Sequence, residues 1–209
     1  MLALLIVAIF IAMPLEVMGY VSPLLVTVVI TFLMLSGVVT ISGSRTVAVV
    51  AAAVALASLG LRWAYFVSPS NAVGCWGDGL GIVALLLVVA FLLRHVFREG
   101  PITSDRIQGA IAVYLLVGLV FCLAYQLVDS VAPGSFHFSE PPLPERAAIN
   151  HRLMYFSFVT LTTVGYGDIT PVHTVARVLA IGEALVGQLY PAILIGRLVS
   201  LQISARNRG

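Results

Sequence analysis

The sequence predicts an all-α integral membrane protein with six membrane-spanning helices and a short re-entrant segment between the fifth and the sixth. Composition is the first observation behind this class, because the 209 residues are 60% hydrophobic and only 10% charged, with a mean hydropathy of +1.08. These values lie far outside the range of soluble domains. The second observation is that the apolar residues form runs of roughly 20, the length that a helix needs to cross a bilayer.

The polar residues exclude several other classes of protein. All eleven basic residues are arginines, so no lysine chemistry is available to an enzyme, and a net charge of +2 indicates no nucleic-acid partner. Two cysteines are too few for a disulfide framework. No His, Cys and carboxylate residues recur at catalytic or metal-ligand spacing. We therefore expect neither an enzyme nor a bound cofactor.

Six apolar runs define the predicted spans. In chain order they are residues 2–20, 23–41, 46–67, 80–97, 107–128 and 172–199. The first run has no basic residues before it and no good cleavage site, so we interpret it as a retained span and not as a signal peptide. Cys75 and Trp76 are expected in the external loop between the third and fourth spans.

Arginine placement predicts the orientation, because excess arginine marks cytoplasmic loops. The arginines assigned to the cytoplasmic side are Arg45, Arg94, Arg98, Arg106, Arg197, Arg206 and Arg208. Those on the other side are Arg62, Arg146, Arg152 and Arg177, where acidic residues dilute them. We expect a multi-pass protein of the cell inner (plasma) membrane with both termini in the cytoplasm and the re-entrant segment outside.

The re-entrant segment is followed by a stretch that cannot be regular helix. About a dozen residues, 150–162, are too few to cross the bilayer, and Asn150 is a plausible N-cap for a short helix there. Non-helical backbone at membrane depth is tolerated where it lines a water-filled path. A dehydrated cation needs a cage of oxygens, and a strand supplies one if left-handed and ordinary backbone conformations alternate. Gly165 and Gly167 adopt the left-handed conformation at no Cβ penalty, and Thr163 adds a hydroxyl oxygen.

This stretch, Thr-Val-Gly-Tyr-Gly at 163–167, resembles the selectivity filter of potassium channels. The likeness extends through a pore helix at 153–163 and through Asp-Ile-Thr-Pro at 168–171 into the last span, and covers about 107–199. The resemblance implies K⁺ bound at Thr163, Val164, Gly165 and Tyr166, with Gly167 completing the filter. One strand forms one side of the cage, so four chains must converge in a C4 homotetramer. The expected partners are K⁺ as the permeant ion and the lipid bilayer.

The resemblance also divides the chain. Residues 1–98 are expected to form a peripheral, sensor-like domain of four helices, 99–106 a cytoplasmic linker, 107–200 the pore domain and 201–209 a short cytoplasmic tail. Such a tail is too short for a ligand-sensing domain.

Four residues are predicted to support the filter. By resemblance, Asp168 braces the filter and concentrates cations at the outer mouth. Tyr155 either hydrogen-bonds Asp168 from behind or lies at the lipid interface as an aromatic anchor. Thr162 is expected at the pore-helix C-terminus, whose dipole favours a cation. Glu183 lies inside the last span and is expected to pack towards the pore helix, protonated or bonded to a hydroxyl such as that of Thr160 or Thr162, as a brace or in gating.

The rest of the last span is predicted to form the cavity and gate. At 100° per residue Glu183 lies about 140° from Gln188, whereas Gln188, Pro191 and Ile195 share one face that would line the cavity. Gly187 resembles the hinge glycine of the family, and Pro191 would remove a backbone hydrogen bond near it. The alternative for Gly187 is close helix packing.

Voltage sensing requires about three to four gating charges per subunit. The predicted fourth span is uncharged over 80–93 and carries only Arg94 and then Arg98 at its cytoplasmic end. We therefore expect a potassium-selective channel without strong intrinsic voltage gating. The alternatives are a voltage-gated potassium channel with a weak sensor, a non-conducting regulatory subunit, and a potassium-transporter subunit. The transporter would show four degenerate filters in one chain.

Overall fold

A computed structural model describes residues 2–12, 14–15, 20, 45–67, 70–98, 103–139 and 146–206. The helices are α1 (Leu2–Val7), the π-helical turn η1 (Ala8–Ala12), α4 (Arg45–Val67), α5 (Asn71–Phe97), α6 (Ser104–Val131), α7 (Arg146–Leu161) and α8 (Thr174–Arg206). The strands are β1 (Phe136–Phe138) and β2 (Ile169–Pro171). The predicted second span, 23–41, lies outside the described residues.

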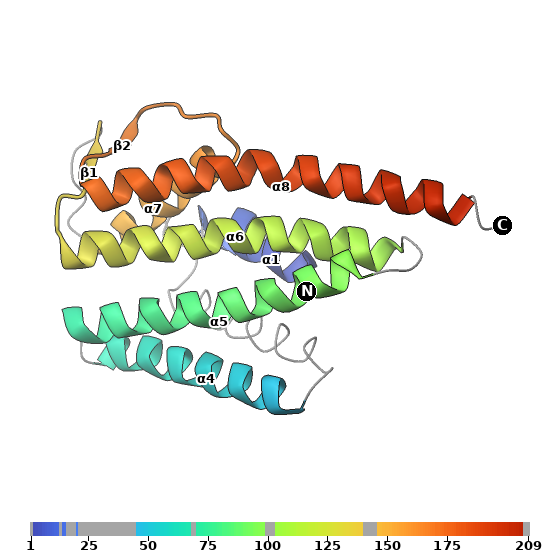
Figure 1. The fold of residues 1–209 in the computed structure, drawn as a ribbon. Helices are drawn as coiled ribbons and strands as arrows, with labels where there is room; N and C mark the ends of the chain where they lie inside the picture. The colour runs from blue at the N-terminus through green and yellow to red at the C-terminus, as the bar shows by residue number, and fades with distance from the viewer. Residues whose placement is uncertain are drawn as a thin grey trace.

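The long helices α4, α5, α6 and α8 lie side by side, with α1 behind α6 and the short α7 beside α8 (Figure 1). Within the described residues three helices are long and apolar enough to cross a membrane: Ala72–Phe97, Ser104–Val131 and Thr174–Arg197. They correspond to the predicted fourth, fifth and sixth spans. The helix α4 covers the third predicted run.

The start of α5 corrects one prediction. We expected Cys75 and Trp76 in a loop, but both lie in α5, which begins at Asn71. The hydroxyl oxygen of Ser70 accepts a hydrogen bond from the backbone N–H of Val73 at 3.3 Å, so Ser70 is the N-cap of this helix. The cap starts the helix nine residues before the apolar run that predicted it.

The re-entrant helix also begins earlier than expected. Because α7 starts at Arg146, Asn150 is a residue of the helix and not its N-cap. The residues that extend it are Arg146, Ala147 and Ala148, which have high helix propensity. At its other end α7 stops at Leu161, one residue before the predicted Thr162.

A two-stranded sheet departs from the predicted all-α class. Antiparallel pairing of β1 with β2 places Phe136 opposite Pro171 and Phe138 opposite Ile169. The last span was predicted from residue 172, whereas α8 begins at Thr174 after β2. The sheet therefore joins the segment before α7 to the segment after the Thr-Val-Gly-Tyr-Gly stretch, and holds both ends of the re-entrant region together.

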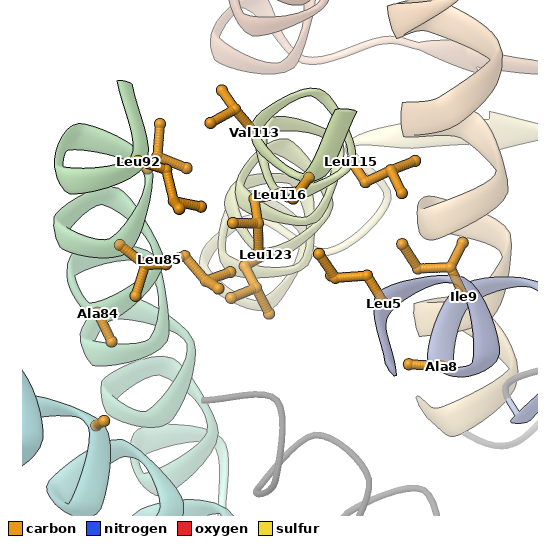
Figure 2. Packing of buried hydrophobic residues seen from close by; sticks show 14 of the residues in the cluster. Leu5, Ala8, Ile9, Ala84, Leu85, Leu92, Val113, Leu115, Leu116 and Leu123 are labelled. Atoms are coloured by element: carbon orange, nitrogen blue, oxygen red, sulfur yellow. The ribbon is translucent and has the colours of Figure 1, made fainter. Parts of the chain in front are cut away.

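One apolar core connects the N-terminal helices to α6. Figure 2 shows Leu5 of α1 and Leu85 of α5 approaching α6 from different directions, where Leu116 and Leu123 lie. Both Leu5 and Leu116 are completely buried. Buried residues from both sides of the predicted linker, 99–106, thus belong to one apolar core.

Candidate functional site

The backbone of the Thr-Val-Gly-Tyr-Gly stretch alternates in handedness. Thr163 has a φ of 59°, Gly165 of 57° and Gly167 of 81°, and these are every second residue. The sequence had assigned this conformation to the two glycines only. Among the described residues Thr163 is the one non-glycine residue with a positive φ, a conformation that costs about 1–2 kcal/mol for an L-residue. Surrounding contacts must therefore hold Thr163 in place.

The contacts that do so come from α7. Four consecutive backbone N–H groups after the helix donate to carbonyl oxygens in its last turns. The bonds are Thr162 to Phe158 (3.0 Å), Thr163 to Thr160 (2.9 Å), Val164 to Val159 (3.0 Å) and Gly165 to Val159 (3.4 Å). The stretch is therefore built directly on the C-terminal end of α7, the end whose dipole favours a cation.

The outer end of the stretch is tied to the sheet and to α7. The backbone N–H of Ser139, just after β1, donates to the carbonyl oxygen of Asp168 at 3.0 Å. The rings of Tyr155 and Tyr166 are stacked, with centroids 6.5 Å apart and planes 4° from parallel. Tyr155 and Asp168 also line one cavity, together with Ser139. Tyr155 thus packs against the stretch, and its hydrogen bond to Asp168 stays a prediction.

The side chain of Glu183 is fully buried between three helices. Its Oε2 lies 2.5 Å from the hydroxyl of Tyr125 on α6, and its Oε1 lies 2.5 Å from the hydroxyl of Ser157 on α7. The expected partners, Thr160 and Thr162, were wrong. Thr162 donates its hydroxyl hydrogen back to its own helix, to the carbonyl of Phe158 at 2.7 Å, whereas Ser157 lies farther back on α7 and meets α8.

Gly187 lies where α8 crosses the end of α7. A Cβ atom at this position would come within 2.8 Å of the carbonyl carbon of Leu161, which is backbone and cannot move aside. The hydroxyl of Tyr114 on α6 donates to the same carbonyl group at 3.2 Å. The structure thus gives Gly187 the close packing that was the alternative to a hinge. The hinge role itself stays a prediction.

The residues predicted to line the cavity differ in exposure. Gln188 and Ile195 are exposed, and Pro191 is half-buried inside a helix that continues to Arg206. Beside them, Tyr190 packs on α6: its hydroxyl donates to the carbonyl of Ala110 at 2.8 Å, and its ring stacks on Tyr114 at 6.1 Å.

No role was predicted from the sequence for Tyr114, Tyr125, Ser157 or Tyr190. A signal was present, because hydroxyl groups inside an apolar run need hydrogen-bond partners in the bilayer. The sequence could not say which helix would supply each partner.

Known proteins share sequence with this part of the chain. A sequence model of a family described as "Ion channel" matches residues 151–203, the segment from α7 into α8. Protein LctB of Bacillus caldotenax is 32% identical over 126 residues, which are 57% of this chain and 92% of the relative. Protein LctB of Geobacillus stearothermophilus is 38% identical over 128 residues with the same coverage. The chain belongs to the ion-channel superfamily.

Two further relatives of this superfamily are longer than the region they share with the chain. A putative potassium channel protein of Rhodopseudomonas palustris is 26% identical over 153 residues, which are 36% of that protein. Two pore potassium channel c of Oryza sativa subsp. japonica is 37% identical over 87 residues, 17% of its length. No solved structure matches the chain.

Proposed function

We propose that this channel is selective for K⁺ over Na⁺ and conducts passively through a filter formed by four copies of residues 163–167. Carbonyl oxygens of Thr163, Val164, Gly165 and Tyr166, with the Thr163 hydroxyl, replace the hydration shell of the ion. Asp168 concentrates cations at the outer mouth. Gln188, Pro191 and Ile195 line the cavity, and α8 bends near Gly187 and Pro191 when the channel opens.

The observation that carries this proposal is the alternation of positive φ at Thr163, Gly165 and Gly167. Because the N–H groups at the start of the stretch are directed to α7, the opposite side of the strand is left for its carbonyl oxygens. A strand of this kind needs copies of itself to complete an oxygen cage.

Exposure of the single chain supports a tetramer. Val164 and Tyr166 of the filter are 53% and 71% exposed, and α8 presents a long apolar face. The exposed apolar residues of that face are Val178, Ile181, Leu185, Leu189, Ile193 and Val199. Four copies around a common axis would cover these side chains and bring the four filters together.

The membrane arrangement in the proposal has six spans, with both termini in the cytoplasm of a cell whose plasma membrane holds the channel. Weak voltage dependence follows from α5, where Arg94 lies in the last turn and is exposed, as is Arg98 beyond it. Arginines at a helix end extend to the headgroups and cross little of the field.

The test is ion flux through purified protein in liposomes, with K⁺ and Na⁺ gradients and Ba²⁺ as a blocker. K⁺ flux that Ba²⁺ stops, with Na⁺ flux lower by at least about a hundredfold, is the expected result. Equal K⁺ and Na⁺ flux would overturn selectivity, and no flux would favour a non-conducting regulatory subunit. A native mass no larger than a dimer would overturn the tetramer.

A further inference from the structure

The contacts around Glu183 contain more hydrogen bonds than the two hydroxyl groups can donate. Besides its contact with the carboxyl group, the Oγ of Ser157 lies 2.7 Å from the carbonyl oxygen of Gly118 on α6. Three close oxygen–oxygen contacts therefore meet here: Tyr125 with Glu183, Ser157 with Glu183, and Ser157 with Gly118. Each such contact needs one hydrogen atom. Tyr125 and Ser157 supply one each, so the third hydrogen must come from Glu183.

A negatively charged carboxylate at this position would leave one contact without a hydrogen atom. If Ser157 donated to a Glu183 carboxylate, its oxygen and the carbonyl oxygen of Gly118 would face each other at 2.7 Å as two acceptors. If Ser157 donated to Gly118, the repulsion would lie between Ser157 and the carboxylate.

The surroundings also do not compensate a negative charge. Glu183 and Ser157 are both 0% exposed. In the part of the chain that the structure describes, the phenol of Tyr125 on α6 contacts the carboxyl group, and that of Tyr114 on α6 interacts with it electrostatically while its hydroxyl donates to Leu161. Among the described residues, the hydrogen-bonding contacts of Glu183 are to hydroxyl groups and not to a basic side chain. An unpaired charge in such a site costs several kcal/mol.

We propose that Glu183 is held as a neutral carboxylic acid that donates its hydrogen to Ser157 and so positions the filter-bearing helix. Ser157 then donates to the carbonyl oxygen of Gly118, and Tyr125 donates to the remaining carboxyl oxygen of Glu183. These hydrogen bonds, called the relay below, join α6, α7 and α8. Each hydroxyl and carboxyl oxygen in the relay then has a hydrogen-bond partner. Its effect on conduction rests on the proposed channel function, whereas its protonation does not.

Because the relay lies close to the end of α7, a change in the relay would displace the filter. Ser157 lies one helical turn before Leu161, where α7 ends and the hydrogen bonds to the filter N–H groups begin. Movement of Ser157 away from α8 would move the carbonyl groups of Val159 and Thr160, which hold Val164 and Thr163.

Infrared difference spectroscopy tests the protonation directly. The spectrum of the assembled wild-type protein at neutral pH minus that of Glu183→Gln should contain the carbonyl band of a protonated carboxylic acid. The subtraction is needed because Asp78 is also buried and could contribute such a band. A difference spectrum that contains only carboxylate bands would overturn the proposal.

Two single substitutions test the direction of the relay and need no change to Glu183. Both Ser157→Ala and Tyr125→Phe should shift the acid band to higher frequency, because each removes a partner of the carboxyl group. The controls are Ser130→Ala and Tyr190→Phe, whose hydroxyls bond the backbone carbonyls of Gln126 and Ala110. A band that none of these substitutions moves, or that all four move equally, would show that Glu183 does not contact Ser157 and Tyr125 as proposed.

Replacement of Glu183 by its amide, glutamine, tests whether Glu183 positions the filter-bearing helix α7. Glu183→Gln keeps a donor for Ser157 and an acceptor for Tyr125, so K⁺ flux per assembled protein should stay within about twofold, whereas Glu183→Leu should lose about tenfold or more. Equal loss in both variants would overturn the positioning role. If Glu183→Leu does not assemble, the K⁺ flux of Glu183→Gln and the shifts of the acid band still test the proposal. An acid band in a protein without flux would overturn the channel function and leave the neutral acid standing.

Discussion

The two sides of α6 are held by different kinds of contact. Towards α5 and α1 the helix presents Val113, Leu116 and Leu123, which are buried among apolar side chains. Towards α7 and α8 it presents Tyr114 and Tyr125, whose hydroxyls bond the carbonyl of Leu161 and the carboxyl group of Glu183. One side is thus an apolar core, whereas the other adds hydrogen bonds to a second apolar cluster around Tyr125.

The difference between the two sides of α6 indicates where this channel must hold atoms accurately in place. Lipid tails are as apolar as leucine, so apolar contacts between helices in a membrane depend on packing and tolerate small shifts. A hydrogen bond fixes two atoms at about 3 Å and fails when one of them moves by about 1 Å. The hydrogen-bonded side is the one that carries the proposed filter, whose carbonyl oxygens would surround an ion. Substitutions should therefore separate the two sides.

The largest effect is expected in the filter itself, from Gly165→Ala. Its φ of 57° is one that alanine adopts poorly, at a cost of about 1–2 kcal/mol, so K⁺ flux or selectivity should be lost. Flux in liposomes measures it. Gly134→Ala is the matched control, since Gly134 has a φ of 82° in open space outside the filter. Equal loss of flux in both variants would mean that backbone strain alone, and not filter geometry, explains the result.

The next largest effect should come from Gly187→Ala, at the contact of α8 with the end of α7. The added methyl group would overlap the backbone of Leu161, and overpacking of this kind costs about 1–3 kcal/mol. The stability of the assembled protein on heating and K⁺ flux should both fall. Gly60→Ala, on α4 and away from the face of α8 that the proposed tetramer would cover, has open space around it and should change neither. If Gly187→Ala instead left stability unchanged and altered only opening, the hinge role would be favoured over close packing.

A smaller effect separates the two sides of α6. Tyr114→Phe removes one hydrogen bond to Leu161, worth about 1 kcal/mol, and should lower K⁺ selectivity or flux per assembled channel. Leu85→Ala, on the apolar side, should cost more stability, about 2–5 kcal/mol, while the channels that assemble keep their selectivity. Thermal melting together with flux measures both. Loss of selectivity in Leu85→Ala would erase the distinction between the two sides.

The smallest effect is expected from Arg94→Gln at the end of α5. Moving one elementary charge through 100 mV is worth about 2.3 kcal/mol, so a steep response requires charges that cross the field. Conductance–voltage curves in planar bilayers with symmetrical K⁺ should be shallow before and after the substitution. A steep sigmoid that flattens in Arg94→Gln would show instead that the N-terminal helices sense voltage.

The sequence alone identified the membrane class and the family and predicted the filter motif, because these depend on composition and on a short contiguous pattern. It also placed Glu183 on the face of the last span opposite Gln188, since helical periodicity fixes that angle. Helix ends were less well predicted. Ser70 and Arg146 extend α5 and α7 beyond their apolar runs, and capping and propensity act there without a change in hydropathy.

Only the tertiary structure decided which residues meet. Ser157 and Tyr125 are 26 and 58 residues from Glu183 in the chain, and no local pattern distinguishes Ser157 from Thr160 or Thr162 as its partner. The positive φ of Thr163 could not be predicted from the sequence either. A β-branched residue adopts such a φ only when neighbouring hydrogen bonds outweigh its intrinsic preference. The chemistry of a motif depends on neighbouring residues and can be predicted from the sequence. Contacts between helices depend on how the whole bundle packs.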